Sequence, residues 1–176
     1  MVVSASHNPY PDNGIKLLDP EGFKWSDDEE AALARRLDRT AGPAAGLPEE
    51  ALVPDETLRE EYLRHLAATV PGERPLDGLR VVVDTGNGAA STYARELFER
   101  LGARVTLLHA APDGRNVNAG CGSTAPDEMA ARVLVEGADL GAAFDGDADR
   151  CILADERGEV RDGDAILYLW ATSLKR

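Results

Sequence analysis

Three aspartates stand at two-residue spacing in the segment 145–150, DGDADR. In an extended loop, side chains two positions apart point to the same side, so the carboxylates of Asp145, Asp147 and Asp149 can converge. Three like charges repel one another, and a bound divalent cation offsets that cost because hard oxygen ligands suit Mg²⁺ or Ca²⁺. The spacing predicts a site for a hard divalent cation, and a solvated acidic turn is the alternative interpretation.

Arg150 ends this segment and bears on the ligand that the site would meet. A calcium-binding EF-hand is excluded because Arg150 occupies the sixth loop position, where that loop needs glycine. The flanking residues also resemble strands rather than helices. An arginine beside a metal site favours a ligand that carries phosphate or carboxylate. A simple counter-charge to the aspartates is the alternative.

A second polar segment, 4–9 (SASHNP), offers hydroxyl groups in a tight turn. A hydroxyl that carries phosphate and a carboxylate loop that holds a cation are complementary parts of a phosphoryl-transfer site. A turn capped by Ser4 or Ser6 is the alternative. We expect the side chains of Ser6 and His7 to point apart, as neighbours in an extended segment do. Lys16 either projects towards this turn or lies in solvent.

Composition sets limits on the partners. The chain has 176 residues and a net charge of −13, which argues against a nucleic-acid or anionic membrane surface. No apolar run approaches the roughly 20 residues of a membrane helix, and no signal peptide is evident. The two cysteines, Cys121 and Cys151, have no metal-binding spacing and are expected to be reduced thiols. We therefore expect a cytoplasmic protein.

The elements around the serine turn are short. Residues 2–3 and 15–18 are typical of strands on either side of the turn. A helix begins at Ser26, which opens the S-x-x-E pattern of a capping box. Its buried face is expected at Leu33 and Leu37.

A linker and a second helix follow. Residues 40–54 are rich in glycine and proline and predict a linker. Asp55 then caps a helix. The expected apolar face of that helix consists of Leu58, Tyr62, Leu63 and Leu66.

From residue 79 the pattern becomes β-α-β-α-β. Strands are predicted at 80–84, 104–108 and 140–144, with helices at 89–101 and from 124 to about 137. Such alternation implies parallel strands joined by right-handed crossovers. The carboxylate segment follows the third strand, at the end of the sheet where open α/β folds place their ligands. A hairpin over 151–160 and an amphipathic helix at 164–174 complete the chain.

Two glycine-rich connections carry weaker signals. The turn 84–88 (DTGNG) permits a sharp strand-to-helix connection, and such a turn can also expose backbone N–H groups to a phosphate. It lacks the full dinucleotide fingerprint, so we favour the structural interpretation. The segment 116–124 is by composition only a loop.

Taken together, these residues resemble the α-D-phosphohexomutase superfamily. The segment 4–9, with DNGIK at 12–16 after it, resembles the phosphoserine loop of that superfamily, and 145–150 resembles its magnesium loop. The stretch 118–123 is most similar to the phosphoglucosamine mutase subfamily. Ala148 departs from the pattern, since many relatives have glycine there.

The resemblance implies a fold and a domain organisation. Members have four domains around a deep cleft. This chain is expected to be α/β, with a three-layer α/β/α mixed-sheet domain of phosphohexomutase type flanked by two incomplete domains. The implied division is the C-terminal part of domain 1 at 1–54, domain 2 at 55–157 and the start of domain 3 at 158–176.

The resemblance also implies a mechanism. Ser6 carries a phosphoryl group and supplies a phosphate oxygen to Mg²⁺, which the three aspartates hold. Lys16 and His7 are the other implied catalytic residues, and Arg150 binds phosphate. Glucosamine 6-phosphate and glucosamine 1-phosphate are interconverted through a bisphosphorylated sugar. The implied partners are a phosphosugar and, for the full-length protein, a second copy in a homodimer.

Two other readings remain open at this point. One is a phosphomannomutase or phosphoglucomutase of the same superfamily. The other is a metal- or phosphate-binding α/β module without turnover, because the sugar-recognition loop and the distal phosphate loop of relatives are not in this sequence. For the same reason we expect little mutase activity from these 176 residues alone.

Overall fold

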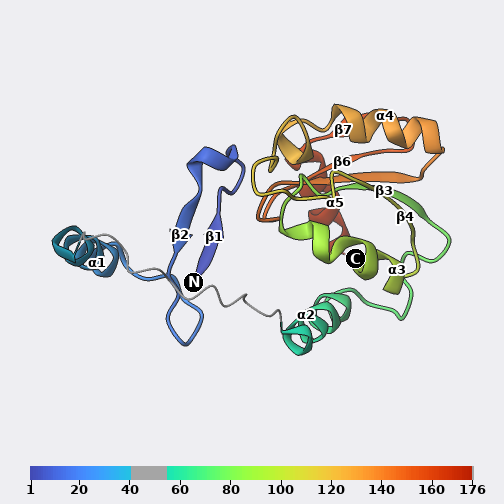
Figure 1. The fold of residues 1–176 in the computed structure, drawn as a ribbon. Coiled ribbons are helices and arrows are strands. Elements are labelled where there is room, and N and C mark those ends of the chain that lie inside the picture. The colour runs from blue at the N-terminus through green and yellow to red at the C-terminus, as the bar shows by residue number, and fades with distance from the viewer. Residues whose placement is uncertain (41–54, 176) are drawn as a thin grey trace.

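The computed structural model describes residues 1–40 and 55–175. The predicted linker therefore lies, apart from residue 40, outside the described residues. At the N-terminus, β1 (Val2–Ser4) pairs in antiparallel fashion with β2 (Gly14–Lys16), and η1 (Tyr10–Asp12) lies between them. The second strand ends two residues earlier than predicted. Figure 1 shows this hairpin between α1 and the larger α/β domain.

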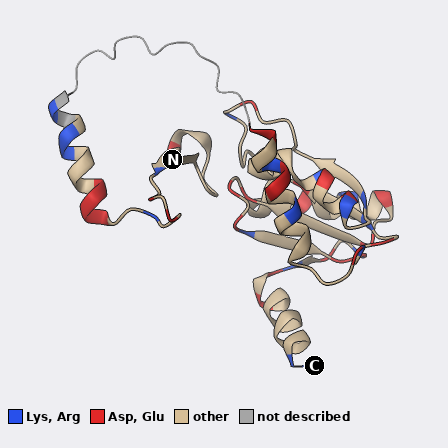
Figure 2. Ribbon diagram, turned by 90° about the horizontal axis from the view of Figure 1, so that it is seen from below, with Lys and Arg blue, Asp and Glu red and all other residues tan. Residues whose placement is uncertain are grey.

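Helix α1 (Asp27–Thr40) begins as predicted. The Glu29 carboxylate accepts the Ser26 amide at 2.8 Å, and the Ser26 hydroxyl accepts the Glu29 amide at 3.4 Å, which completes the capping box. Acidic residues occupy its first turn and basic residues follow, as Figure 2 shows. The predicted buried face is wrong, since Leu33 is only half-buried and Leu37 is exposed. Both leucines line a surface pocket together with Met1, Ile15 and Leu17, so the small hairpin and the segment after it cover them only in part.

Helix α2 (Glu56–Ala68) is capped by Asp55, whose carboxylate accepts the amides of Thr57 at 2.9 Å and Leu58 at 3.3 Å. The predicted four-residue apolar face is only partly correct. Leu63 is fully buried, whereas Leu58 and Tyr62 are exposed.

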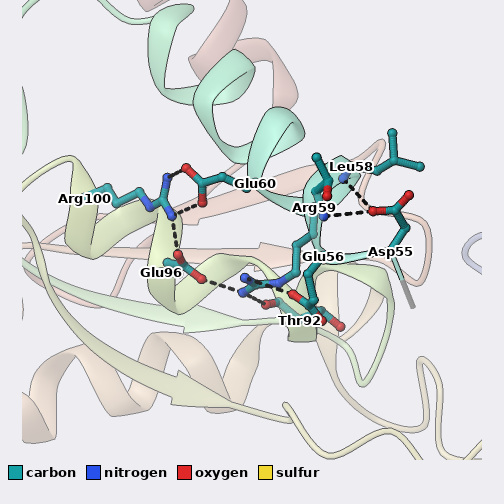
Figure 3. A network of polar contacts seen from close by, with 9 residues as sticks. Asp55, Glu56, Leu58, Arg59, Glu60, Thr92, Glu96 and Arg100 are labelled. Carbon is teal, nitrogen blue, oxygen red and sulfur yellow. Dashed lines mark hydrogen bonds and ion pairs between the residues drawn. The ribbon is translucent and has the colours of Figure 1, made fainter. Parts of the chain in front are cut away.

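Polar contacts join α2 to α3 (Ala94–Arg100), as Figure 3 shows. Arg59 lies 2.5 Å from the Glu96 carboxylate, and Arg100 contacts the carboxylates of Glu60 and Glu96. Charged side chains therefore supply part of the contact between α2 and the domain, beside the buried Leu63 and the edge-on pair of Tyr62 and Tyr93.

A five-stranded sheet forms the larger domain, in the order β4-β3-β5-β6-β7. Its strands are β3 (Arg80–Asp84), β4 (Arg104–Leu108), β5 (Leu140–Phe144), β6 (Cys151–Ala154) and β7 (Val160–Arg161). Strands β4, β3 and β5 are parallel, as predicted, and the predicted hairpin adds β6 and β7 in antiparallel fashion. The sheet is therefore mixed.

Helices cover both faces of this sheet. Val81 and Val83 pack with residues of α3 on one face, while Val82 packs with residues of α4 (Asp127–Glu136) on the other. The alternation follows from the two-residue period of a strand. This arrangement confirms the predicted three-layer α/β/α domain, which is visible in Figure 1.

Two helix predictions need correction. The segment 89–101 is not one helix, because η2 (Ala89–Thr92) precedes α3. The Ala89 amide donates to Gly146 O at 2.9 Å, which ties the start of this segment to the carboxylate loop.

The final helix, α5 (Gly163–Leu174), is not amphipathic in the predicted sense. None of its residues is buried, and large apolar side chains such as Tyr168, Leu169 and Trp170 lie exposed on neighbouring faces. Figure 2 shows it as a nearly uncharged helix that projects from the domain. Among the described residues, none of the helices has the length and apolar character needed to cross a membrane.

Candidate functional site

The serine turn and the carboxylate loop meet at one backbone oxygen. Ser6 O accepts the Gly146 amide at 3.2 Å and the side-chain amide of Asn118 at 2.7 Å. The same Asn118 nitrogen donates to Asn8 O at 2.9 Å. The two segments that the sequence singles out, although far apart along the chain, therefore form one site.

Two glycines make this approach sterically feasible. A Cβ atom at Gly146 would lie 2.5 Å from Ser6 O, and one at Gly88 would lie 2.4 Å from Gly146 O. Real Cβ atoms do not come this close, so larger residues would push the three segments apart. The turn 84–88 thus packs against the carboxylate loop, and Asp84 accepts the Gly86 amide at 2.9 Å. These contacts support the structural interpretation of that turn.

Ser6 adopts a strained backbone conformation. Its φ is 52°, in the left-handed region that residues other than glycine rarely enter. Its amide donates to the Ser4 hydroxyl at 2.9 Å, so Ser4 holds the turn. The Ser6 hydroxyl lies 3.4 Å from His7 Nδ1. The expectation that these side chains point apart is wrong, because the left-handed residue reverses the chain direction that an extended segment would keep.

The three aspartates differ in exposure but their oxygens converge. Asp145 is fully buried, Asp147 is half-buried and Asp149 is exposed, and one carboxylate oxygen of each lies within 4.8 Å of the others. Within the described part of the chain, the buried atoms Asp145 Oδ2 and Asp147 Oδ1 have no hydrogen-bond partner. Buried polar atoms without partners are costly, and a hard cation would satisfy both. The residues present therefore fit a divalent metal ion.

Burial and neighbouring charges act differently on two of these carboxyl groups. Burial raises the pKa of Asp145, and the charges of Asp147 and Asp149 add to that effect, while the Arg150 amide at 3.1 Å opposes it. Burial would also raise the pKa of Asp147. The Lys16 ammonium, 3.2 Å from Asp147 Oδ2, outweighs this effect, so the pKa of Asp147 is lowered.

Lys16 and Arg150 take up different positions. The Lys16 side chain reaches from β2 across to the carboxylate loop, so it lies at the site rather than free in solvent. Arg150 is exposed, and only its backbone amide contacts Asp145. Among the described residues no ion pair joins its guanidinium to the aspartates, which argues against a simple counter-charge.

Sequence reasoning missed Asn118, which it placed in a loop without further role. Its φ is 55°, and asparagine tolerates this conformation better than most residues. Among the described residues, its amide nitrogen is the only side-chain donor to Ser6 O. An asparagine inside a run of small polar residues was the available signal, but its partner is more than a hundred residues away.

The fold and the site together define a class of protein. The model of the phosphoglucomutase/phosphomannomutase α/β/α domain II matches residues 60–158, and that of domain I matches residues 1–42. The chain therefore belongs to the phosphoglucomutase/phosphomannomutase family.

Curated relatives with high similarity to this chain are named phosphoglucosamine mutase. The chain is 46% identical to the phosphoglucosamine mutase of Parvibaculum lavamentivorans over 179 residues, which is 99% of this chain and 40% of that protein. It is 47% identical to that of Symbiobacterium thermophilum, across 99% of this chain and 39% of the relative. The chain thus spans about two fifths of the length of the curated relatives it matches.

Solved structures agree on the fold. A phosphoglucomutase/phosphomannomutase family protein from Burkholderia thailandensis superposes with a TM-score of 0.70 at 28% identity, covering 98% of this chain and 37% of that one. A putative phosphomannomutase from Thermus thermophilus gives 0.68 at 22% identity, over 97% of this chain and 40% of the other, and supports the fold alone.

Proposed function

We propose that this chain forms the phosphoserine and metal-binding part of a phosphoglucosamine mutase, an intramolecular phosphotransferase of the isomerase class. The reaction interconverts glucosamine 6-phosphate and glucosamine 1-phosphate in the cytoplasm, as a step towards amino-sugar nucleotides and cell-wall precursors. The observation that carries the proposal is the docking of the Ser6 turn on the carboxylate loop through Gly146 and Asn118. The names of the curated relatives favour glucosamine over other sugars.

Ser6 is the proposed phosphate carrier. Phosphorylated Ser6 passes its phosphoryl group to the free hydroxyl of a sugar monophosphate, which gives the bisphosphorylated sugar. After this sugar has reoriented, the Ser6 oxygen takes the phosphoryl group from its other position, which leaves the isomeric monophosphate and restores phosphorylated Ser6. Ser4 is held as an acceptor for the Ser6 amide, so Ser6 is the better candidate of the two. His7, with Nδ1 3.4 Å from the Ser6 hydroxyl, is suited to hold or move the proton of that group.

Asp145, Asp147 and Asp149 are the proposed protein ligands of Mg²⁺, with a phosphate oxygen on Ser6 as a further ligand. When bound, Mg²⁺ would offset negative charge on the transferring phosphoryl group. The two partnerless buried oxygens support this assignment.

Two basic residues complete the proposed site. Lys16 keeps Asp147 ionised, as the lowered pKa of that carboxyl group indicates, and brings positive charge to the edge of the site. Arg150 exposes its guanidinium beside the loop, where it suits a phosphate of the incoming sugar. The division into domain parts at 1–54, 55–157 and 158–176 remains part of this proposal.

The test is transfer of a phosphoryl group to the chain. The purified protein is incubated with Mg²⁺ and glucosamine 1,6-bisphosphate, and intact-mass and peptide analysis locate the added phosphate. We expect modification at Ser6, loss of modification in Ser6→Ala, and its retention in the matched control Ser4→Ala. Phosphate retained in Ser6→Ala would contradict the assignment of the carrier.

The same assay on the full-length protein discriminates between sugars, because the sugar-recognition loop of relatives is not in this sequence. Mannose 1,6-bisphosphate and glucose 1,6-bisphosphate are offered at equal concentration. Faster modification by glucosamine 1,6-bisphosphate is expected, and a clear preference for either of the others would support the phosphomannomutase or phosphoglucomutase reading instead.

A further inference from the structure

A second cluster of metal-ligating side chains lies apart from the aspartate loop. Asp84 ends β3, His109 directly follows β4, and Cys121 precedes η3 (Gly122–Thr124). A carboxylate oxygen, a ring nitrogen and the sulfur of these residues all lie within 4.8 Å of one another. Asp84 and Cys121 are fully buried, and the His109 side chain is 24% exposed. Three different elements thus bring an O, an N and an S ligand to one point.

The carboxylate of Asp84 is held in place before any ligand binds. Its two oxygens accept the amides of Gly86 and Gly122, each at 2.9 Å. His109 Nδ1 lies 3.0 Å from Asp84 Oδ2. That nitrogen is buried, yet it makes no hydrogen bond of acceptable geometry with the described residues. A buried nitrogen that points at a carboxylate and a thiol without a proper partner is an unmet ligand atom.

The orientation of His109 is also fixed. Its φ is 47°, and its carbonyl accepts both the Thr85 hydroxyl and the Asn87 amide at 2.6 Å. Its other ring nitrogen, Nε2, lies 3.4 Å from the Glu128 carboxylate. Histidines that bind metals through one nitrogen commonly place the other against a carboxylate, which sets the tautomer and the ring orientation.

We propose that Asp84, His109 and Cys121 form a second cation site, which takes Zn²⁺. Mixed oxygen, nitrogen and sulfur ligands suit Zn²⁺, whereas Mg²⁺ prefers oxygen alone. Tetrahedral zinc places ligand atoms about 3.4 Å apart. The 3.0 Å between His109 Nδ1 and Asp84 Oδ2 is close to that spacing, so small side-chain movements would give these atoms the spacing of tetrahedral zinc ligands. Three protein ligands leave one position for water.

Zinc binding has a cost here, because the Cys121 thiol must lose its proton. Burial, together with the nearby Asp84 charge, raises the pKa of Cys121 to about 11. Zn²⁺ must therefore displace this proton, as it does wherever thiolates are ligands. The alternative is a buried thiol that packs beside an Asp–His pair and binds no metal. The test must distinguish this alternative from a zinc site.

The site would act on the loop that holds the serine turn. Gly122, next to Cys121, is so close to β5 that a Cβ atom there would lie 2.3 Å from Phe144 O. The same connection carries Asn118, which donates to Ser6 O. Zn²⁺ would link this connection to the ends of β3 and β4, and so stabilise the contact between Asn118 and the serine turn.

The test uses Co²⁺ as a spectroscopic substitute for Zn²⁺. The chain is first freed of bound metals with a chelator. It is then kept in excess Mg²⁺, which favours oxygen ligands and is expected to occupy the aspartate loop. One equivalent of Co²⁺ should produce a near-ultraviolet thiolate-to-metal band that equimolar Zn²⁺ abolishes. Cys121→Ser and His109→Asn should lose the band, and the matched control Cys151→Ser should keep it. Asparagine at position 109 tolerates the left-handed backbone, so the loss is not due to misfolding.

Competition with a chelator then gives the affinity for Zn²⁺. Glu128→Gln should weaken it by about tenfold, as changes to a histidine's supporting carboxylate do. Absence of a thiolate band, or a band that survives in Cys121→Ser and disappears in Cys151→Ser, would overturn the proposal. Circular dichroism on each variant confirms that the fold is intact.

Discussion

The contact between Asn118 and the serine turn gives the sharpest prediction about how the site is assembled. The Asn118 side chain donates to Ser6 O at 2.7 Å and to Asn8 O at 2.9 Å. Asn118→Asp has almost the same shape and tolerates the φ of 55°, but a carboxylate cannot donate and would face two carbonyl oxygens. We therefore expect the turn to detach from the carboxylate loop more often.

The magnitude follows from the two lost hydrogen bonds. Each contributes about 0.5–1.5 kcal/mol, so docking should weaken by about 1–3 kcal/mol, or roughly 5- to 150-fold in the docking equilibrium. The Gly146 amide still donates to Ser6 O, which keeps the loss from being complete.

Hydrogen exchange measures this directly. The Gly146 amide is protected only while Ser6 O accepts it, so its exchange should accelerate in Asn118→Asp by the same factor. Asn116→Asp is the matched control, because the Asn116 side chain donates to Ala111 O within its own connection. Equal exchange at Gly146 in wild type and Asn118→Asp, with both folded, would refute the reasoning.

Three further predictions concern stability. Ala148 has a φ of 61°, so Ala148→Gly should stabilise the chain by about 0.5–1 kcal/mol in thermal unfolding, and a loss of stability would contradict this. A Cβ atom at Gly141 would lie 2.1 Å from Met129 Sδ, so Gly141→Ala should cost about 1–3 kcal/mol in urea unfolding, whereas an unchanged midpoint would show that the core adapts. Hydrogen bonds from Arg59 and Arg100 lower the pKa of Glu96, so its contribution is full above about pH 5 and is lost as pH falls through the lowered value. Glu96→Gln should flatten the pH dependence of stability in that range, and an unaltered slope would argue against the network.

The sequence predicted the elements whose signals are local. The strands at 80–84, 104–108 and 140–144 match β3, β4 and β5 because each is a short apolar run flanked by turn residues. The caps at Ser26 and Asp55 were predicted for the same reason, since a cap depends on residues a few positions apart.

Features that depend on distant partners were not predictable in this way. The partner of Asn118 is in the serine turn, and the left-handed φ of Ser6 occurs at a residue that, unlike glycine, does not signal this conformation in the sequence. The buried faces of α1 and α2 were misjudged because periodicity shows which side is apolar, but not what covers it. Cys121 was not predicted as a metal ligand because the two cysteines have no metal-binding spacing in the sequence. In the fold, it lies beside Asp84 and His109, which come from two other segments of the chain.

The central claim is that phosphate on Ser6 shares a metal ion with the three aspartates. Phosphorus NMR of the chain with phosphoserine incorporated at Ser6 tests it without any sugar, with paramagnetic Mn²⁺ added in place of Mg²⁺. We predict that one equivalent of Mn²⁺ broadens the phosphoserine signal beyond detection, and that Asp147→Asn restores it at the same Mn²⁺ concentration. A sharp signal from wild-type chain that is shown to have bound Mn²⁺ would contradict the account.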